Sequence, residues 1–300
     1  MIKHQYGNTS TEDLWNAISD ATDVPVVGNM DQWIKHAGYP VLTVTEEINT
    51  GTILVEQSRF LNSSKGFQSS SLILGETADQ ELWWVPLGIK TGMDAAQGRD
   101  TRILDKEKRC DRYPVDLTFY KLNDSSAGVF RVNYPAKRLE ILGKQVAIGD
   151  KRINGSDRIS LVADAHALAI SGTISTSEFL ALIENFTLES NLFVWEELLH
   201  CLSQLRSAWY EQPEHIKNGL RAFSRKLISG KVGEIGWDAK PTESYLTSQL
   251  RPLLLKQAAF AGIHQSHQCF NNLLSLVLVQ KPRDDSTHGS MVISLLYRHT

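Results

Sequence analysis

The chain has 300 residues, of which 42% are hydrophobic and 22% are charged, and its formal net charge is −3. These values are typical of globular proteins with a sizeable core, and a net charge so near zero argues against a nucleic-acid partner, because phosphate binding needs a basic surface. The sequence has only three, widely spaced cysteines, no secretory signal and no run of about 18 apolar residues, so we expect a cytoplasmic protein without a membrane partner.

Two short helices are predicted at the start of the chain. Thr9 and Glu12 have the spacing of a capping box, in which each side chain binds the other residue's backbone N–H, so a helix is expected over residues 9–21. A second helix is expected over about 29–36. Gly38 is available to end it in the left-handed conformation.

The apolar side chains of these two helices predict an interaction surface. Trp15, Trp33 and Ile34 lie in segments too short to build a core of their own. Large apolar patches usually mark contact sites, so these three residues are candidates for contact with another part of the protein or with a partner.

From residue 39 to residue 135 the apolar period changes to two, which is typical of strands. The segments "LWWVPLGIKT" and "GVFRVNYP" both alternate apolar with other residues. Strands joined by polar loops, with no helix between them, favour antiparallel pairing. We therefore expect a β-sandwich domain over 39–135.

Arg131 and Asn133 share one face of a predicted strand, opposite Phe130 and Tyr134. They could present hydrogen-bond donors to a peptide, or they could simply cover the sheet. The structural interpretation is favoured, and the peptide-facing role stays open.

After Pro135 the apolar spacing becomes helical and stays so for more than a hundred residues. Asp157 and Arg158 open one helix, where an acidic residue meets the positive end of the dipole, and Ser175 with Glu178 forms a capping box for the next. A strong apolar stripe then follows at helical spacing: Trp195, Leu198, Leu199, Leu202, Leu205 and Trp209. We predict an all-α solenoid of helical hairpins (HEAT-like) over 136–300, with an atypical tail from about 263. The fold class is then α+β and multidomain.

No metal site is assigned from the sequence. The His-Glu-x-x-His motif, which places two imidazoles one helical turn apart on a zinc ion, is absent. Glu197 and His200 have the spacing of half a carboxylate-bridged metal site, but we interpret them as a polar helix edge because the other half is missing. His264, His267 and Cys269 could supply three zinc ligands, although no second cluster follows.

No catalytic or cofactor-binding residue is assigned either. Gly230, Gly233 and Gly236 do not match the dinucleotide fingerprint and follow a helix rather than a strand, so we expect a loop between helices. The motifs of P-loop proteins and of serine hydrolases are absent. A dispersed Cys, His and Asp triad, and with it an independent enzyme of another class, rests on no motif.

Several uncommon strings together resemble a known family. The strings "NTSTEDLWNAISDATDVPVVGNMDQWIKHAGYPVLTVTEE", "LWWVPLGI", "AGVFRVNYP" and "GSDRISLVADAHALAISGTIS" are similar, in the same order, to zinc aminopeptidases of the puromycin-sensitive and aminopeptidase N group. The resemblance runs from about residue 6 to residue 262. It implies that residues 1–38 correspond to the end of the catalytic domain, followed by the β-sandwich and the helical C-terminal domain.

The resemblance also implies a noncatalytic role. The family's zinc helix, its other zinc ligand and its catalytic tyrosine all lie before the position that matches Thr9, so zinc belongs to the complete enzyme and no residue here binds it. In that enzyme the helical domain shapes the substrate cavity and closes over the active site, and the substrates are peptides. We therefore expect no peptidase activity from this chain alone.

A second interpretation is a stand-alone module that binds peptides or proteins. Such a module could dock onto the missing catalytic domain or onto a full-length aminopeptidase through Trp15, Trp33 and Ile34.

Overall fold

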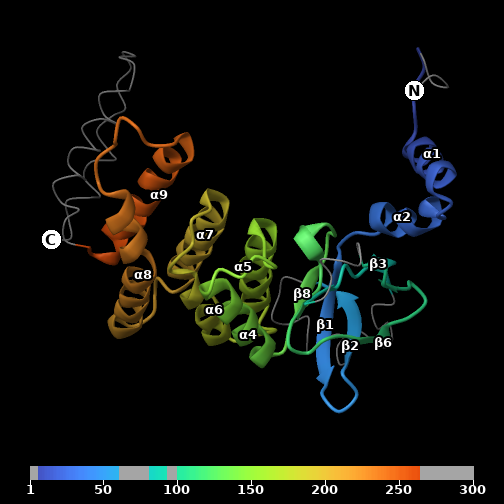
Figure 1. The fold of residues 1–300 in the computed structure, drawn as a ribbon, viewed down its shortest axis with the longest axis horizontal. Coiled ribbons are helices and arrows are strands. Elements are labelled where there is room, and N and C mark those ends of the chain that lie inside the picture. Colours follow the sequence, from blue (N-terminus) through green and yellow to red (C-terminus); the bar gives the residue numbers. More distant parts are fainter. Residues whose placement is uncertain (1–5, 61–80, 93–99, 264–300) are drawn as a thin grey trace.

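The computed structural model describes residues 6–60, 81–92 and 100–263. The prediction of an α+β fold is confirmed: strands gather at one end of the molecule and a row of helices extends from them (Figure 1). The predicted tail and the candidate ligands His264, His267 and Cys269 lie outside the described residues.

The first two helices form near their predicted positions but with different ends. Helix α1 (Thr11–Thr22) starts two residues later than expected, and its capping box joins Ser10 and Asp13, one residue on from Thr9 and Glu12. Helix α2 (Val26–Lys35) follows Pro25, and its C-cap His36 has an extended backbone. Gly38, at a φ of 106°, therefore turns the chain into the first strand instead of ending the helix.

The main sheet has four strands in the order β6-β2-β1-β8. These strands are β1 (Pro40–Glu47), β2 (Thr52–Arg59), β6 (Cys110–Pro114) and β8 (Arg131–Asn133). Strand β2 pairs antiparallel with both β1 and β6, but β8 runs parallel to β1. The prediction of wholly antiparallel pairing is therefore wrong at this edge, because the chain returns to β1 only after a long connection that also carries the smaller strands.

Two short antiparallel ladders complete the described strands. Strand β3 (Val85–Pro86) pairs with β5 (Ile103–Leu104), and β4 (Lys90–Thr91) pairs with β7 (Tyr120–Lys121). The predicted alternation is confirmed in the burial, because one set of side chains is at most 5% exposed: Trp83, Val85, Leu87, Ile89, Phe130, Val132 and Tyr134. The arrangement of these ladders and the main sheet as a sandwich stays a prediction.

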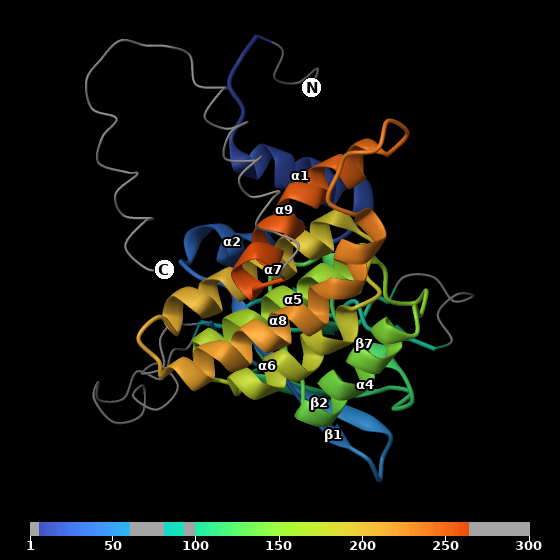
Figure 2. The same ribbon diagram turned by 90° about the vertical axis from the view of Figure 1, so that its left-hand side faces the viewer.

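The helical half contains α4 (Ala136–Ala147), α5 (Gly155–Ile170), α6 (Thr176–Ile183), α7 (Leu192–Ala208), α8 (Glu214–Ile235) and α9 (Tyr245–Ala261). Helix α7 contacts both α5 and α9, whereas α4 contacts α6. The helices therefore lie in two layers, with α5, α7 and α9 above α4, α6 and α8 (Figures 1 and 2). This layering is consistent with a solenoid of hairpins, which stays a prediction.

Local sequence signals, such as capping residues and apolar spacing, predict most of these helices. The capping box of Ser175 and Glu178 is confirmed at the start of α6. The predicted loop around Gly230 and Gly233 is wrong, because both residues lie inside α8, and only Gly236, at a φ of 75°, ends the helix. The apolar residues Leu227, Ile228 and Val232 continue the buried stripe through the glycines and outweigh their low helix propensity.

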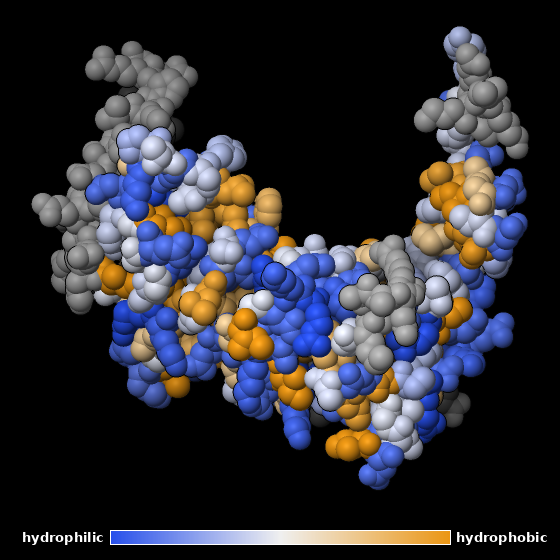
Figure 3. Space-filling view, in the orientation of Figure 1, coloured by the Kyte–Doolittle hydropathy of each residue, from blue (hydrophilic) through white to orange (hydrophobic). Residues whose placement is uncertain are grey.

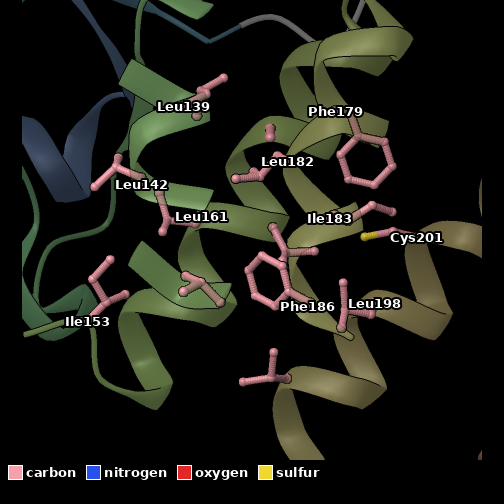
Figure 4. Packing of buried hydrophobic residues seen from close by; sticks show 14 of the residues in the cluster. Leu139, Leu142, Ile153, Leu161, Phe179, Leu182, Ile183, Phe186, Leu198 and Cys201 are labelled. Atoms are coloured by element: carbon pink, nitrogen blue, oxygen red, sulfur yellow. The ribbon is translucent and has the colours of Figure 1, made fainter. Parts of the chain in front are cut away.

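The layers are held by a continuous apolar core that extends from the strands into the helices. Helix α6 is followed by a short 3-10 turn, η4 (Glu184–Phe186). Figure 4 shows the apolar side chains of these two elements facing Leu161 of α5 and Leu198 of α7; they are Phe179, Leu182 and Ile183 of α6 and Phe186 of η4. Each of these side chains is at most 3% exposed. Burying one such side chain stabilises the fold by roughly 1.5–3 kcal/mol.

A buried carboxylate joins the strands to the helices. Asp157 of α5 is inaccessible to solvent, and its two oxygens lie 3.0 Å from Nζ of Lys121 and 2.9 Å from Nζ of Lys90. It also accepts the backbone N–H groups of Asn154 and Ser125. Burial lowers the pKa of Lys121, and Asp157 opposes that shift. The predicted helix-opening role of Asp157 is confirmed, and Arg158 forms an ion pair with Glu189.

We expect Asp157→Asn to destabilise the chain by about 3–5 kcal/mol, because it removes the negative charge beside two lysines of which one is fully buried. Denaturant unfolding followed by circular dichroism measures this loss. Asp111→Asn, which breaks a solvent-exposed pair with Lys108, is the matched control and should change the midpoint little. Equal midpoints for the two variants would contradict a structural role for the buried carboxylate.

Candidate functional site

The surface of α1 and α2 is amphipathic but uncovered. Neither helix contains a buried residue, and the side chains of Leu14 and Ile34 are 54% and 51% exposed. Figure 3 shows apolar side chains gathered on this arm of the molecule. The indole N–H of Trp15 is shielded from solvent yet has no hydrogen-bond partner among the described residues.

Trp33 holds this helical pair against the strands. Its indole Nε1 donates to the carbonyl of Trp84 at 3.0 Å, and its ring centroid lies 6.4 Å from that of Trp83. Trp33 is half-buried by these contacts. The three candidates of this surface are thus placed differently: Trp33 packs inward, Trp15 is half-buried and Ile34 faces solvent.

Arg131 makes its contacts within the protein. Its guanidinium lies over the rings of Tyr39 and Phe60, and it forms an ion pair with Asp164 of α5 at 3.1 Å. Burial raises the pKa of Asp164 to about 6, and the Arg131 charge limits that rise. Asn133 is half-buried on the same strand and pairs through its backbone with Thr43. This geometry favours a covering role for both residues over a peptide-facing one.

A groove of about 350 Å³ lies where α7, α8 and α9 meet, and we call it the Arg206 groove. Its lining residues are Leu202, Arg206, Ser207, Trp209, Tyr210, Lys217, Leu220, Arg221, Ser224, Gln257, Phe260 and Ala261. The guanidinium carbon of Arg206 lies 3.9 Å from the centroid of the Phe260 ring. Lys217 and Arg221 both pair with Glu214.

Arg206 itself is an uncompensated cation. Its guanidinium donates to Gln257 and Ser203, and among the described residues it has no carboxylate partner. Burial lowers the pKa of Arg206. A charged, aromatic and partly shielded groove of this kind is suited to an anionic group of a ligand, because the guanidinium can bind a carboxylate with two hydrogen bonds. The sequence did not reveal this groove, since Arg206 lies beside the apolar stripe of α7, which indicated only a core.

The candidate metal pair on α7 lies near a buried histidine. Glu197 accepts from the thiol of Cys201 at 3.4 Å, and His200 contacts Gln204. His166 of α5 is buried with its ring 5.3 Å from that of Phe179. Burial lowers the pKa of His166 and raises that of Cys201. Within the described ranges, no group of three or more His, Cys, Asp or Glu side chains is placed to hold a metal ion.

The molecule as a whole is hollowed on one side. The layer of α5, α7 and α9 forms the floor and one wall of this hollow, and α1 with α2 stands opposite (Figures 1 and 3). Across the part of the chain that the structure describes, no helix combines the length and the apolar composition needed to cross a bilayer.

Comparison with known families identifies the helical half. A family model described as "ERAP1-like C-terminal domain" matches residues 119–286. The chain belongs to this family. The matched region starts just before β7 and includes all the helices from α4 to α9, so the Arg206 groove lies within it.

Several curated relatives are aminopeptidases. Aminopeptidase 2 of Candida albicans is 37% identical over 261 residues, which cover 86% of this chain and 26% of the relative. The alanine/arginine aminopeptidase of Saccharomyces cerevisiae is 34% identical over 87% of this chain and 28% of the relative. The puromycin-sensitive aminopeptidase of Caenorhabditis elegans is 27% identical over 91% and 28%. The chain thus spans about a quarter of the length of these relatives, and the predicted resemblance to aminopeptidases is confirmed.

His166 gives a prediction about stability and pH. Because its pKa is lowered in the folded chain, the unfolded chain binds the proton first as the pH falls, so the contribution of His166 to stability is present above about pH 6.5 and is lost below it. Denaturant unfolding between pH 7.5 and 5 measures this slope.

A His166→Phe variant should show a shallower loss of stability on acidification than the parent chain. His215→Phe, at an exposed position, is the control. The same slope in His166→Phe and in the parent would show that the buried imidazole is not responsible.

Proposed function

We propose that this chain is the noncatalytic C-terminal portion of a zinc aminopeptidase and that its helical layers form a wall of the cavity that holds the peptide. Membership of the ERAP1-like C-terminal domain family and the aminopeptidase relatives support the first part. The observation that carries the second part is the Arg206 groove, a cavity of about 350 Å³ with an uncompensated cation in the helical layer.

The described residues do not fit a zinc ion, since no cluster of suitable ligands exists among them. Zinc would be held by the catalytic domain of the complete enzyme, where it would activate the water that attacks the peptide bond. The residues of this chain would act by binding and orienting. An arginine beside an aromatic ring can hold an acidic group of the peptide away from the scissile bond, and fixing a substrate at a distant point lowers the entropy that the reaction must overcome.

A wall built from stacked helices is also suited to closing over the active site of the complete enzyme. Layers that each contact only their neighbours can move as a unit against the rest of an enzyme, and closing such a wall excludes water from the reacting groups. Such a movement would narrow the hollow between the layer of α5, α7 and α9 and the arm formed by α1 and α2.

The peptide-binding part is tested with the purified chain and two fluorescein-labelled peptides that differ by one central glutamate or glutamine. We expect the glutamate peptide to bind more tightly, and Arg206→Gln to weaken its binding roughly tenfold, because a hydrogen bond to a charged group contributes about 1.5–3 kcal/mol. Fluorescence anisotropy measures both affinities.

The same samples test the absence of catalysis. With zinc added, neither peptide should lose its first residue over hours, as followed by mass spectrometry. Lys256→Glu, an exposed change outside the Arg206 groove, is the control for folding and charge. Cleavage that a chelator abolishes would refute the noncatalytic role, and equal binding of both peptides by the parent and by Arg206→Gln would refute the role of the groove.

The exposed face of α1 and α2 supports a second candidate function, a binding module that docks onto a catalytic domain or a full-length aminopeptidase. Leu14 and Ile34 are available for such a contact, whereas Trp33 is engaged with the strands. A covering partner could also accept the hydrogen bond of Trp15 after a small side-chain movement.

For this function we expect the double variant Leu14→Glu, Ile34→Asp to lose binding to an immobilised full-length family aminopeptidase, because the charges would be buried without partners. Surface plasmon resonance measures the loss. Val129→Glu, a similar change at a side chain that is 72% exposed, is the control. Binding that survives the double variant but not the control would assign docking to the strands instead.

A further inference from the structure

A second surface of the helical half is hollowed, apart from the Arg206 groove. Two hollows of about 460 and 340 Å³ meet at Ser190, which lines both of them. The larger lies between the start of α7, the end of α8 and the start of α9, and the smaller lies between the α4–α5 turn and the residues before α7. We call this continuous depression the edge groove.

Three helices begin along the edge groove. The N-caps of α5, α7 and α9 are Asn154, Asn191 and Ser244, and each of them lines one of the two hollows. Alternate helices of the stack run in the same direction, so their positive ends gather on one edge. The caps already bind the first N–H groups of their own helices, and the carboxylates of Asp157 and Glu189 lie at the starts of α5 and α7, so the dipoles contribute a weakened field rather than free donors.

Apolar side chains are exposed beside this field. Leu188 lines the smaller hollow and is 80% exposed, while Phe193 and Leu246 line the larger and are 57% and 52% exposed. Three large apolar side chains on one depression exceed the scattered exposure that is usual on surfaces, and such a patch marks a contact site.

The charges of the edge groove are not balanced. Each acidic lining residue is held in an ion pair, in the pairs Asp150–Arg152, Glu189–Arg158, Glu234–Lys231 and Glu243–Arg251. Lys151 and Lys240 line the smaller and the larger hollow and are exposed, and neither side chain forms a salt bridge among the described residues, although the hydrogen bond from Arg251 and, less strongly, the charge of Lys240 lower the pKa of Glu243. The edge groove thus presents two exposed lysines, one in each hollow, at an edge where three helices begin.

We propose that the edge groove is a docking site for an extended acidic segment of another protein, in which acidic and apolar side chains alternate. The two lysines would pair with carboxylates, and the apolar side chains would fill the spaces beside Phe193, Leu188 and Leu246. An extended chain suits two connected hollows better than a compact ligand, because its side chains repeat at short intervals. This site is independent of the aminopeptidase role proposed above.

The test uses the full chain and a fluorescein-labelled decapeptide of alternating glutamate and leucine, with its lysine and leucine counterpart as the control probe. Fluorescence anisotropy should show binding of the acidic decapeptide only, and this binding should weaken as salt is added. Lys151→Glu combined with Lys240→Glu should weaken binding by roughly tenfold or more, because like charges then face each other. Phe193→Ser should weaken it separately.

Two control variants keep the result specific. Lys256→Glu makes a similar charge change outside the groove and should not alter binding of the acidic decapeptide, whereas Arg206→Gln removes binding in the other groove, so the lysine and Phe193 variants are also compared in that background. Loss of all binding in the Arg206→Gln background, equal binding in the double lysine variant and Lys256→Glu, or no binding by the parent chain would each overturn the proposal. Self-association that Phe193→Ser abolishes in sedimentation would assign the groove to a second copy and would overturn it as well.

Discussion

The buried carboxylate of Asp157 is the constraint on which the two halves of the molecule depend. Without it, the buried ammonium group of Lys121 would keep only the backbone carbonyls of Leu122 and Asn123 as hydrogen-bond acceptors, which is costly. With it, the start of α5 is fixed at once to β4, to β7 and to the turn at Ser125. This charged contact therefore helps to set the direction in which the row of helices leaves the strands, together with the ion pair of Arg131 with Asp164.

The helical half could be predicted from the sequence because its information is local. The spacing of Trp195, Leu198 and Leu202 predicts which face of α7 is buried. The capping box of Ser175 and Glu178 predicts where α6 starts. The parallel pairing of β8 with β1 could not be predicted in this way, because it depends on contacts between residues far apart in the chain. The glycines of α8 favour a loop by their low helix propensity, but the apolar stripe around them outweighs it.

The sites could be predicted only in part. The sequence predicts Trp33 as a candidate contact residue and leaves a peptide-facing role open for Arg131, but composition cannot distinguish an aromatic side chain that faces a partner from one that faces its own strands. Arg206 was missed for the opposite reason, since a single cation next to a strong apolar stripe looks like its solvent-facing border. The folded structure is needed to see that the Arg206 guanidinium packs over the Phe260 ring of α9 and has no carboxylate partner among the described residues.

The position of β1 inside the sheet has a consequence for how the chain is made. As the polypeptide leaves the ribosome, β2 can pair with β1 immediately, but Val41 meets its partner Arg131 only about 90 residues later. During that interval one edge of β1 is open to any other extended chain. We therefore expect chaperones to bind nascent chains of intermediate length, and products that terminate before residue 131 to aggregate.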